Sequence, residues 1–255
     1  MSVPGGPPRI VSLVPSLTET LWALGLAERV VGRTEYCVSP PGVFPHAREV
    51  RGTKNPDVAA IVELAPDLVL ADREENREID VRRLREAGLE VHVTGVRSVS
   101  DVARELGRLG AVLGVPAAAE RLAIEVWTAL DRAVPARPAL RAVCPVWWDG
   151  QARWWLLGRD TYAGDLLGVA GFDTWPDDPA SRYPQESTDA VLDTHPEVVL
   201  LPDEPYAFEP GSATPLAPVG TQVRHVHGQA LLWWGPRTPG AIADLAALAR
   251  GLRGQ

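Results

Sequence analysis

The chain has 255 residues, 45% of them hydrophobic, and a formal net charge of −8 at pH 7. This length and apolar content allow one large domain or two lobes with a sizeable core. The negative charge excludes a nucleic-acid binder of the usual basic type and electrostatic attachment to an anionic membrane surface. The two cysteines, Cys37 and Cys144, have no zinc-type spacing, and we do not expect a disulfide between them.

The N-terminal sequence MSVPGGPPRIVSLVPS lacks the charged start and the apolar stretch of about 7–15 residues that mark a signal peptide. No apolar run approaches the roughly 20 residues that span a bilayer. The sequence therefore predicts a soluble protein without an export signal, cytoplasmic by this criterion. A misassigned start codon would hide such a signal.

The first half is predicted to alternate strands and helices after a disordered segment at residues 1–8. A buried strand is expected at 10–14, and Ser16 with Glu19 fits a capping box for a helix at 17–25. The remaining predicted elements are strands at 30–32, 68–71 and 91–93, helices at 57–64, 76–87 and 99–113, and a loop at 35–56.

Residues 115–134 have apolar side chains at helical spacing and no turn residue after Pro116. Pro116 and Pro135 bound this stretch, which predicts a long helix connecting the two halves.

The second half shows the same alternation, and we expect parallel sheets flanked by helices in both halves. RAVCPVWW is predicted to be one strand. The other expected elements are helices at 161–170, 188–194 and 240–251, strands at 198–201 and 223–226, and a loop at 203–220.

Three pairs of segments indicate that the two halves are repeats about 130 residues apart. IVELAPDLVL at 61–70 matches VLDTHPEVVL at 191–200. RIVSL is echoed by RAVCPV, and VHVTG by VRHVHG. Two similar α/β halves predict a ligand-binding cleft between them.

Ligands of open α/β sheets bind outside the carboxyl ends of the strands, which selects particular loops. Six of the nine tryptophans form adjacent pairs in the second half, at 147–148, 154–155 and 233–234. Because adjacent strand residues point to opposite faces, at most one of each pair enters a given core. The others predict an aromatic ligand site, with ordinary core and rim aromatics as the alternative.

Candidate metal ligands are few. His225 and His227 would share one strand face, and Cys37 and His46 share a loop that could hold a metal or cap a cobalt or iron centre. A buried cysteine and a loop histidine are the alternative. The motifs G-x-S-x-G, GxxxxGK[ST] and HExxH are all missing from the sequence, so we expect no enzyme.

The segments RIVSLVPSLTETLWALGL, VVGRTEYCV and GTKNPDVAAIVELAPDLVLADREEN resemble the first lobe of class III periplasmic binding proteins. GDLLGVAGFDTW, YPQESTDAVLDTHPEVVLLPDE and LLWWGPRTPGAIADLAALA are similar to the second lobe. The resemblance covers roughly residues 9–250 and is nearest to the helical-backbone metal receptors and cobalamin-binding proteins.

The resemblance implies an α/β fold of two lobes joined by one rigid helix. The ranges are 9–113 for the first lobe, 114–135 for the helix and 136–255 for the second lobe. The ligand would be a metal chelate, namely cobalamin, an iron–siderophore or haem, held between the lobes for an ABC importer. No intrinsic cofactor and a monomeric state are expected.

The predicted ligand contacts are polar groups that orient the chelate and aromatic faces that cover it. They are Ser16, Tyr36, Cys37, Arg73, Asn76, Trp148, Tyr183, Tyr206 and Trp234. A solvated loop at 72–76 is the alternative for Arg73 and Asn76. The cobalamin-binding family member has an aromatic residue where this chain has Asp72, although Tyr183 keeps one at the matching second-lobe position.

The resemblance also implies that one exposed acid on each lobe docks onto arginines of the permease. The matching residues are Glu78 and Asp189, with Glu186 as a near alternative. Ordinary surface carboxylates are the other interpretation. A cytoplasmic cofactor-handling protein or enzyme on the same scaffold is the alternative function.

Overall fold

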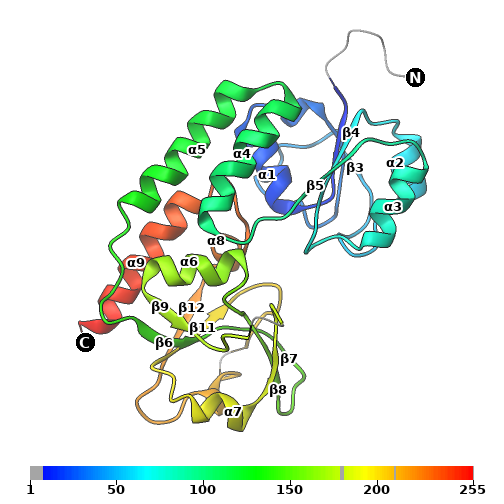
Figure 1. The fold of residues 1–255 in the computed structure, drawn as a ribbon. Coiled ribbons are helices and arrows are strands. Elements are labelled where there is room, and N and C mark those ends of the chain that lie inside the picture. The colour runs from blue at the N-terminus through cyan, green and yellow to red at the C-terminus, as the bar shows by residue number, and fades with distance from the viewer. Residues whose placement is uncertain (1–7, 179–180, 210, 255) are drawn as a thin grey trace. The chain divides into compact units, whose positions relative to one another are not determined.

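A computed structural model of the chain describes residues 8–178, 181–209 and 211–254 (Figure 1). The chain forms two compact units, Met1–Gly95 with Leu109–Ala119 and Val96–Arg108 with Glu120–Gln255. Residues 96–108, which the predicted ranges assign to the first lobe, group with the second unit. The predicted disorder falls on residues 1–7, which lie outside the described residues, and on exposed Pro8.

The first unit contains a five-stranded parallel sheet in the order β3-β2-β1-β4-β5. All five residues of β4 are buried, as expected for a strand covered on both faces. Helices α2 and α3 cover one face and α1 the other (Figure 1). The bounds are β1 (Ile10–Ser12), β2 (Val30–Arg33), β3 (Arg48–Glu49), β4 (Leu68–Asp72), β5 (Val91–Thr94), α1 (Pro15–Ala23), α2 (Val58–Glu63) and α3 (Glu78–Glu86), with a short 3₁₀ turn at Ala27–Arg29.

The predicted capping box at the start of α1 is wrong. The helix begins at Pro15 with Val14 as its N-cap, and no side chain caps it. Proline at the first helical position has the φ angle that a helix needs and no amide that requires a partner. Ser16 therefore lies within the first turn, where it is buried.

The long helix predicted for residues 115–134 is present as α5 (Pro116–Asp131). It follows α4 (Val99–Leu113), whose predicted bounds match the structure. Gly114, with φ of 72°, makes the turn between the two helices, a conformation that glycine adopts without strain. Along the chain, α5 passes from the first unit to the second after Ala119.

The second unit contains a parallel sheet, as predicted, and its four strands lie in the order β12-β11-β6-β9. It also contains an antiparallel sheet in the order β10-β8-β7. The prediction of one strand over RAVCPVWW is wrong, because the run divides at Cys144 between the two sheets. Pro145 follows and has no amide hydrogen to continue the first ladder. The bounds are β6 (Leu140–Val143), β7 (Pro145–Trp148), β8 (Arg153–Leu156), β9 (Phe172–Thr174), β10 (Gln185–Ser187), β11 (Val198–Pro202) and β12 (Gln222–Val226).

The antiparallel sheet was not predicted and differs from the expectation of parallel sheets alone. Asp149 makes its hairpin turn by accepting hydrogen bonds from three successive backbone amides, those of Gln151, Ala152 and Arg153. Trp154 of β8 is fully buried against Val199 and other residues of the parallel sheet. The antiparallel sheet thus covers a face of the second unit that helices cover in the first.

Helices α6 and α9 lie on the other face of the four-stranded sheet (Figure 1). Thr161 caps α6 by accepting from the Gly164 amide at 3.0 Å, and Gly171, with φ of 100°, ends it. No helix in the described ranges is long and apolar enough to cross a bilayer. The bounds are α6 (Tyr162–Ala170), α7 (Thr188–Asp193), α8 (Gly228–Leu232) and α9 (Thr238–Arg253), with a 3₁₀ turn at Thr214–Leu216, and α8 was not predicted.

The predicted repeat is present in the strand register. Strands β2-β1-β4-β5 correspond in order to β9-β6-β11-β12. Ile10 pairs with Leu68 as Ala142 pairs with Val198. The two units therefore share a framework, and their differences lie in what is attached to it.

Candidate functional site

Asp72 ends β4 at the carboxyl edge of the first sheet. The Thr94 hydroxyl donates to its carboxylate at 2.6 Å, and the Glu74 amide donates at 2.8 Å. Burial raises the pKa of Asp72, although these hydrogen bonds and the charge of Lys54 act in the opposite direction. The carboxyl group is thus occupied in joining β5 to the loop after β4.

Asn76 is buried, and the chain uses both ends of its side-chain amide. The Nδ2 atom donates to the Thr53 carbonyl at 2.9 Å and to the Leu13 carbonyl at 3.4 Å. The Oδ1 atom accepts from the Asp72 amide at 2.8 Å. These bonds hold three strand-end loops together, so Asn76 positions the loops instead of presenting its amide at the surface.

Cys37 is buried beside two threonine hydroxyls, 2.9 Å from Thr18 Oγ1 and 3.1 Å from Thr34 Oγ1. Burial raises the pKa of its thiol, which keeps it protonated. Ser16 is also buried, and its carbonyl accepts from the Thr20 hydroxyl at 2.8 Å. Neither predicted contact exposes its side chain.

Two predicted residues of the first unit are exposed at the strand ends. Tyr36 is 57% exposed, and Arg73 is exposed directly after β4. Arg73 lies along Gly95, where a Cβ atom would be 3.7 Å from Arg73 Nε. Of the first-unit set, these two present a phenol and a guanidinium to solvent.

Trp147 is the exposed member of the first tryptophan pair of the second unit, at 49%. Its ring meets Tyr206 edge to face, with centroids 5.1 Å apart, and Tyr206 packs against Phe208 at 4.7 Å. Tyr206 follows β11, so this aromatic surface lies beside the carboxyl edge of the parallel sheet. The predicted set contains Tyr206 but not Trp147.

Trp148 faces the other way, as the alternation of side chains along a strand requires. It stacks on Trp154 with ring centroids 4.9 Å apart and an interplanar angle of 6°. Its Nε1 atom is inaccessible to solvent and has no hydrogen-bond partner among the described residues. Trp148 is therefore chiefly a packing residue with an unused donor.

Trp233 and Trp234 are both buried, so the expectation that one of each pair avoids the core fails here. They follow α8 and do not belong to a strand, and the alternation rule does not apply to them. The Arg237 guanidinium lies 5.3 Å from the Trp233 ring centroid.

Tyr183, the remaining predicted aromatic contact, is 40% exposed.

Glu204 follows β11 and was not singled out from the sequence. The indole of Trp233 and the side chain of Gln229 form hydrogen bonds with it. Burial raises the pKa of Glu204, and the neighbouring Asp203 carboxylate raises it further. The adjacent Asp203 accepts from the Gly228 amide at 2.6 Å. In the sequence, two adjacent acidic residues after a strand look the same whether they belong to a solvated turn or to a ligand site.

The candidate metal ligands do not converge. His46, His225 and His227 are exposed, and His227 lies beyond the end of β12, so the expected shared strand face is wrong. His227 instead caps α8, accepting from the Ala230 amide at 3.4 Å. Within residues 8–178, 181–209 and 211–254, no three His, Cys, Asp or Glu side chains are grouped to hold a metal ion.

The three acids predicted to dock a permease lie on different elements. Glu78 is the first residue of α3 and Asp189 lies in the first turn of α7, and both are exposed. Glu186, in β10, is half-buried. Because α7 corresponds to α2 in the repeat, Glu78 and Asp189 are not equivalent positions.

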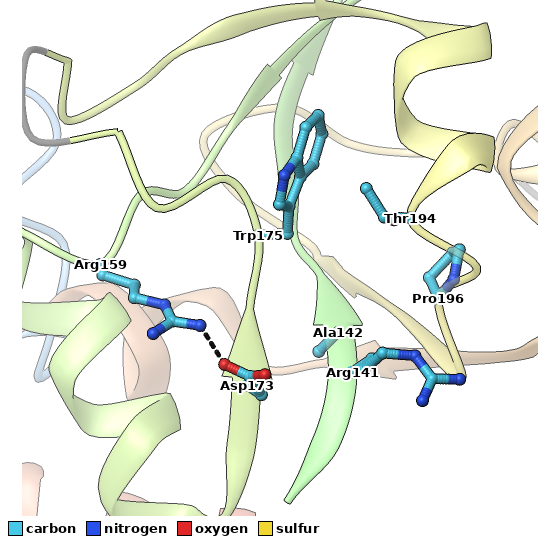
Figure 2. A pocket seen from close by; sticks show the side chains of 7 residues that line it. All are labelled: Arg141, Ala142, Arg159, Asp173, Trp175, Thr194 and Pro196. Atoms are coloured by element: carbon cyan, nitrogen blue, oxygen red, sulfur yellow. Dashed lines mark hydrogen bonds and ion pairs between the residues drawn. The ribbon is translucent and has the colours of Figure 1, made fainter.

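A pocket of about 140 Å³ lies in the second unit between the start of β6 and the edge strand β9 (Figure 2). Its two guanidiniums are engaged, since Arg159 pairs with Asp173 and Arg141 lies 3.5 Å from Glu197. Ligand sites for drug-sized molecules measure roughly 300–1,000 Å³. This pocket is too small for a tetrapyrrole. The remaining lining residues are Ala142, Trp175, Thr194 and Pro196.

The family model described as periplasmic binding protein matches residues 10–210. The chain belongs to this family. The match covers most of both units, including both parallel sheets apart from β12. Family members of this description are binding proteins located in the periplasm, and the family does not favour the enzyme alternative.

The relatives that this periplasmic binding protein matches in sequence are also named as binding proteins. A cobalamin-binding protein of Halobacterium salinarum is 29% identical over 198 residues, covering 76% of this chain and 53% of its own length. An ABC transporter substrate-binding lipoprotein of Bacillus subtilis, otherwise uncharacterized, is 27% identical over 77% of this chain and 64% of its own length. The chain thus spans about half to two thirds of the length of these relatives.

Among solved structures, the periplasmic heme-binding protein RhuT from Roseiflexus sp. RS-1 superposes with a TM-score of 0.79. The two sequences are 24% identical, and the alignment covers 97% of this chain and 99% of the other. This likeness shows that the two proteins share a fold.

Proposed function

We propose that this protein binds a metal chelate, namely cobalamin, haem or a ferric siderophore, as the substrate-binding component of an ABC importer. The observation that carries the proposal is the aromatic surface that exposed Trp147 and half-buried Tyr206 form beside the carboxyl edge of β11. Ligands of open α/β sheets bind at this edge, and aromatic faces suit large planar macrocycles. The ligand is cargo, and no intrinsic cofactor is needed.

The first unit carries exposed polar groups at the carboxyl ends of its own strands. Tyr36 and Arg73 are exposed at the strand ends, while Asp72 and Asn76 fix the loops beneath them. A set of exposed contacts on a hydrogen-bonded frame suits the binding of a ligand.

The names of relatives support the same class of ligand, because one is a cobalamin-binding protein and another binds haem. We further propose that the protein works outside the cytoplasm as a monomer and docks onto a permease. The docking acids would be Glu78 on α3 and Asp189 on α7, with Glu186 as the alternative for the second unit. Nucleic acid is not among the proposed partners.

Titration with cyanocobalamin, haemin and ferrichrome, followed by tryptophan fluorescence and confirmed by calorimetry, tests the proposal. We expect saturable binding of one of the three chelates with quenching of the signal. A protein with nine tryptophans also reports non-specific quenching. Free indole at matched absorbance therefore serves as the control. Calorimetric silence with all three chelates would overturn the proposal.

A further inference from the structure

Glu204 lies two residues beyond the end of β11, at the carboxyl edge of the four-stranded parallel sheet. In open α/β sheets the ligand is held outside this edge. The exposed ring of Trp147 packs on Tyr206, only two residues further along the same loop. The carboxyl group of Glu204 therefore belongs to the segment that carries the proposed aromatic contact.

The carboxyl group is held in place and is not a loose surface acid. The Trp233 indole and the Gln229 side chain form hydrogen bonds with it. Gly228 leaves space for the Glu204 side chain. A Cβ atom at position 228 would collide with Glu204 Cγ and lie 2.9 Å from Asp203 Oδ1. A carboxyl group held by two donors and packed against a glycine is a positioned acceptor.

The charges around Glu204 are mostly negative. The segments 203–206 and 227–233 contain the carboxylates Asp203 and Glu204 but no lysine or arginine. His227 interacts electrostatically with Glu204, and Arg237 lies over the ring of Trp233, whose indole N–H donates to Glu204. A half-buried site with this composition attracts hydrogen-bond donors and repels carboxylates.

We infer, on the basis of the chelate-binding function proposed above, that Glu204 determines ligand specificity. It accepts hydrogen bonds from chelates whose rim carries N–H donors, such as primary amides, and it discriminates against chelates whose rim carries carboxylates. Specificity of this kind is a difference between two affinities, and the repulsive contribution matters as much as the attractive one.

The test measures the affinities of cyanocobalamin, which has a rim of primary amides, and of haemin, which has two carboxylates. Both are measured by calorimetry for the unmodified protein, Glu204→Gln and Glu204→Lys. The unmodified protein should prefer cyanocobalamin. Glu204→Lys should weaken cyanocobalamin about tenfold and strengthen haemin about tenfold, whereas Glu204→Gln, which keeps an acceptor oxygen, should strengthen haemin by only about threefold.

Glu209→Lys is the matched control, because it makes the same change of charge at an exposed position later in the loop. Equal effects of the two lysine substitutions, or a preference of the unmodified protein for haemin, would overturn the inference. Glu204→Gln covers the case in which Glu204→Lys fails to fold. If the unmodified protein binds chelates with affinities that no substitution at position 204 changes, only this inference fails. If it binds no chelate at all, the proposed function fails and this inference with it.

Discussion

The backbone amide of Arg141 donates to the carboxylate of Glu197 at 2.9 Å, and the Glu197 amide returns a hydrogen bond of 2.9 Å to the Arg141 carbonyl. Arg9 and Asp67 make the same reciprocal pair in the first unit, at 2.7 and 2.8 Å. The sequence repeat thus extends to individual hydrogen bonds. In the second unit Arg253 of α9 joins the pair, with its Nη1 atom 2.6 Å from Glu197.

Glu197→Gln should lower the free energy of unfolding by about 1–2 kcal/mol at neutral pH, because it removes charge-assisted hydrogen bonds. Burial acts to raise the pKa of Glu197, but the Arg141 amide and Arg253 outweigh it and the pKa is lowered. The stabilisation by the carboxylate is therefore present above its ordinary pKa of 4.5 and is lost as the pH falls through the lowered value. Urea denaturation at about pH 7 and about pH 3 should show the difference between the variants shrinking in acid.

Glu63→Gln is the control for this prediction. Glu63 lies 2.9 Å from Arg48, and both side chains are largely exposed. Exposed pairs contribute about 0–1 kcal/mol, and this variant should stay within about 0.5 kcal/mol of the unmodified protein. Equal losses from Glu63→Gln and Glu197→Gln would contradict the special role of Glu197.

Asp72→Asn should leave the protein at least as stable at about pH 7, whereas Asp72→Ala should cost about 1–3 kcal/mol. The asparagine keeps an acceptor for the Glu74 amide and a partner for the Thr94 hydroxyl, and alanine removes both. Since burial raises the pKa of Asp72, ionisation penalises the folded state. That penalty is absent below the ordinary value of 3.8 and complete above the raised value.

Thermal unfolding of these variants across pH 3 to 8, by about one-unit steps, checks the sign of the effect. The gain of Asp72→Asn over the unmodified protein should be largest at neutral pH and should vanish in acid. A gain that grows as the pH falls would contradict the assignment of Asp72 as a carboxyl group disfavoured by burial.

The sequence predicted the parallel framework well because local signals agreed with the fold. Val99–Leu113 was bounded correctly, and Thr161 and Gly171 fixed the ends of α6 through their cap geometry. The sequence did not predict the antiparallel sheet, because its strands are short and one of them, β7, continues an apolar run from β6. An apolar run of this kind indicates which residues are buried, but not where the chain passes from one sheet to another.

The site was harder to predict than the framework. The strand-end rule selected loops at the carboxyl edges of the two parallel sheets, but whether a side chain in such a loop is buried depends on contacts distant in sequence. Asn76 was expected to reach a ligand, and it binds the carbonyls of Leu13 and Thr53 instead. The sequence alone could not distinguish Trp147 from Trp148. In the structure, Trp147 faces solvent and Trp148 stacks on Trp154.

Trp147→Ala should weaken binding of the chelate identified by titration by about 5- to 30-fold, as expected for loss of one exposed aromatic contact. The thermal midpoint should fall little, because Trp147 is about half exposed and contacts mainly Tyr206. Trp22→Ala is the control, since Trp22 on α1 is 45% exposed and lies outside the strand-end loops. Equal losses of affinity in both variants would rule out a specific contact at Trp147.

Reversal of both proposed docking charges, Glu78→Arg with Asp189→Arg, should abolish chelate uptake by cells while leaving the affinity of the purified protein unchanged. The expectation follows from like-charge repulsion at a positively charged permease surface. Glu86→Arg with Asp193→Arg makes the same change at the opposite ends of the same two helices. Uptake that survives the first pair of substitutions, or that is lost equally with the second, would contradict docking through Glu78 and Asp189.

The division of RAVCPVWW at Cys144 has a consequence for which parts of the second unit can vary. In the first unit, only residues 13–14 separate β1 from α1, whereas residues 144–161 separate β6 from the corresponding helix α6. The tryptophan hairpin is thus an insertion whose two ends return to an unaltered parallel scaffold. Because Trp154 lies in the core and β8 also pairs with β10, only the outward side chains of this hairpin, such as Trp147, are free to vary while the register of the parallel sheet stays unchanged.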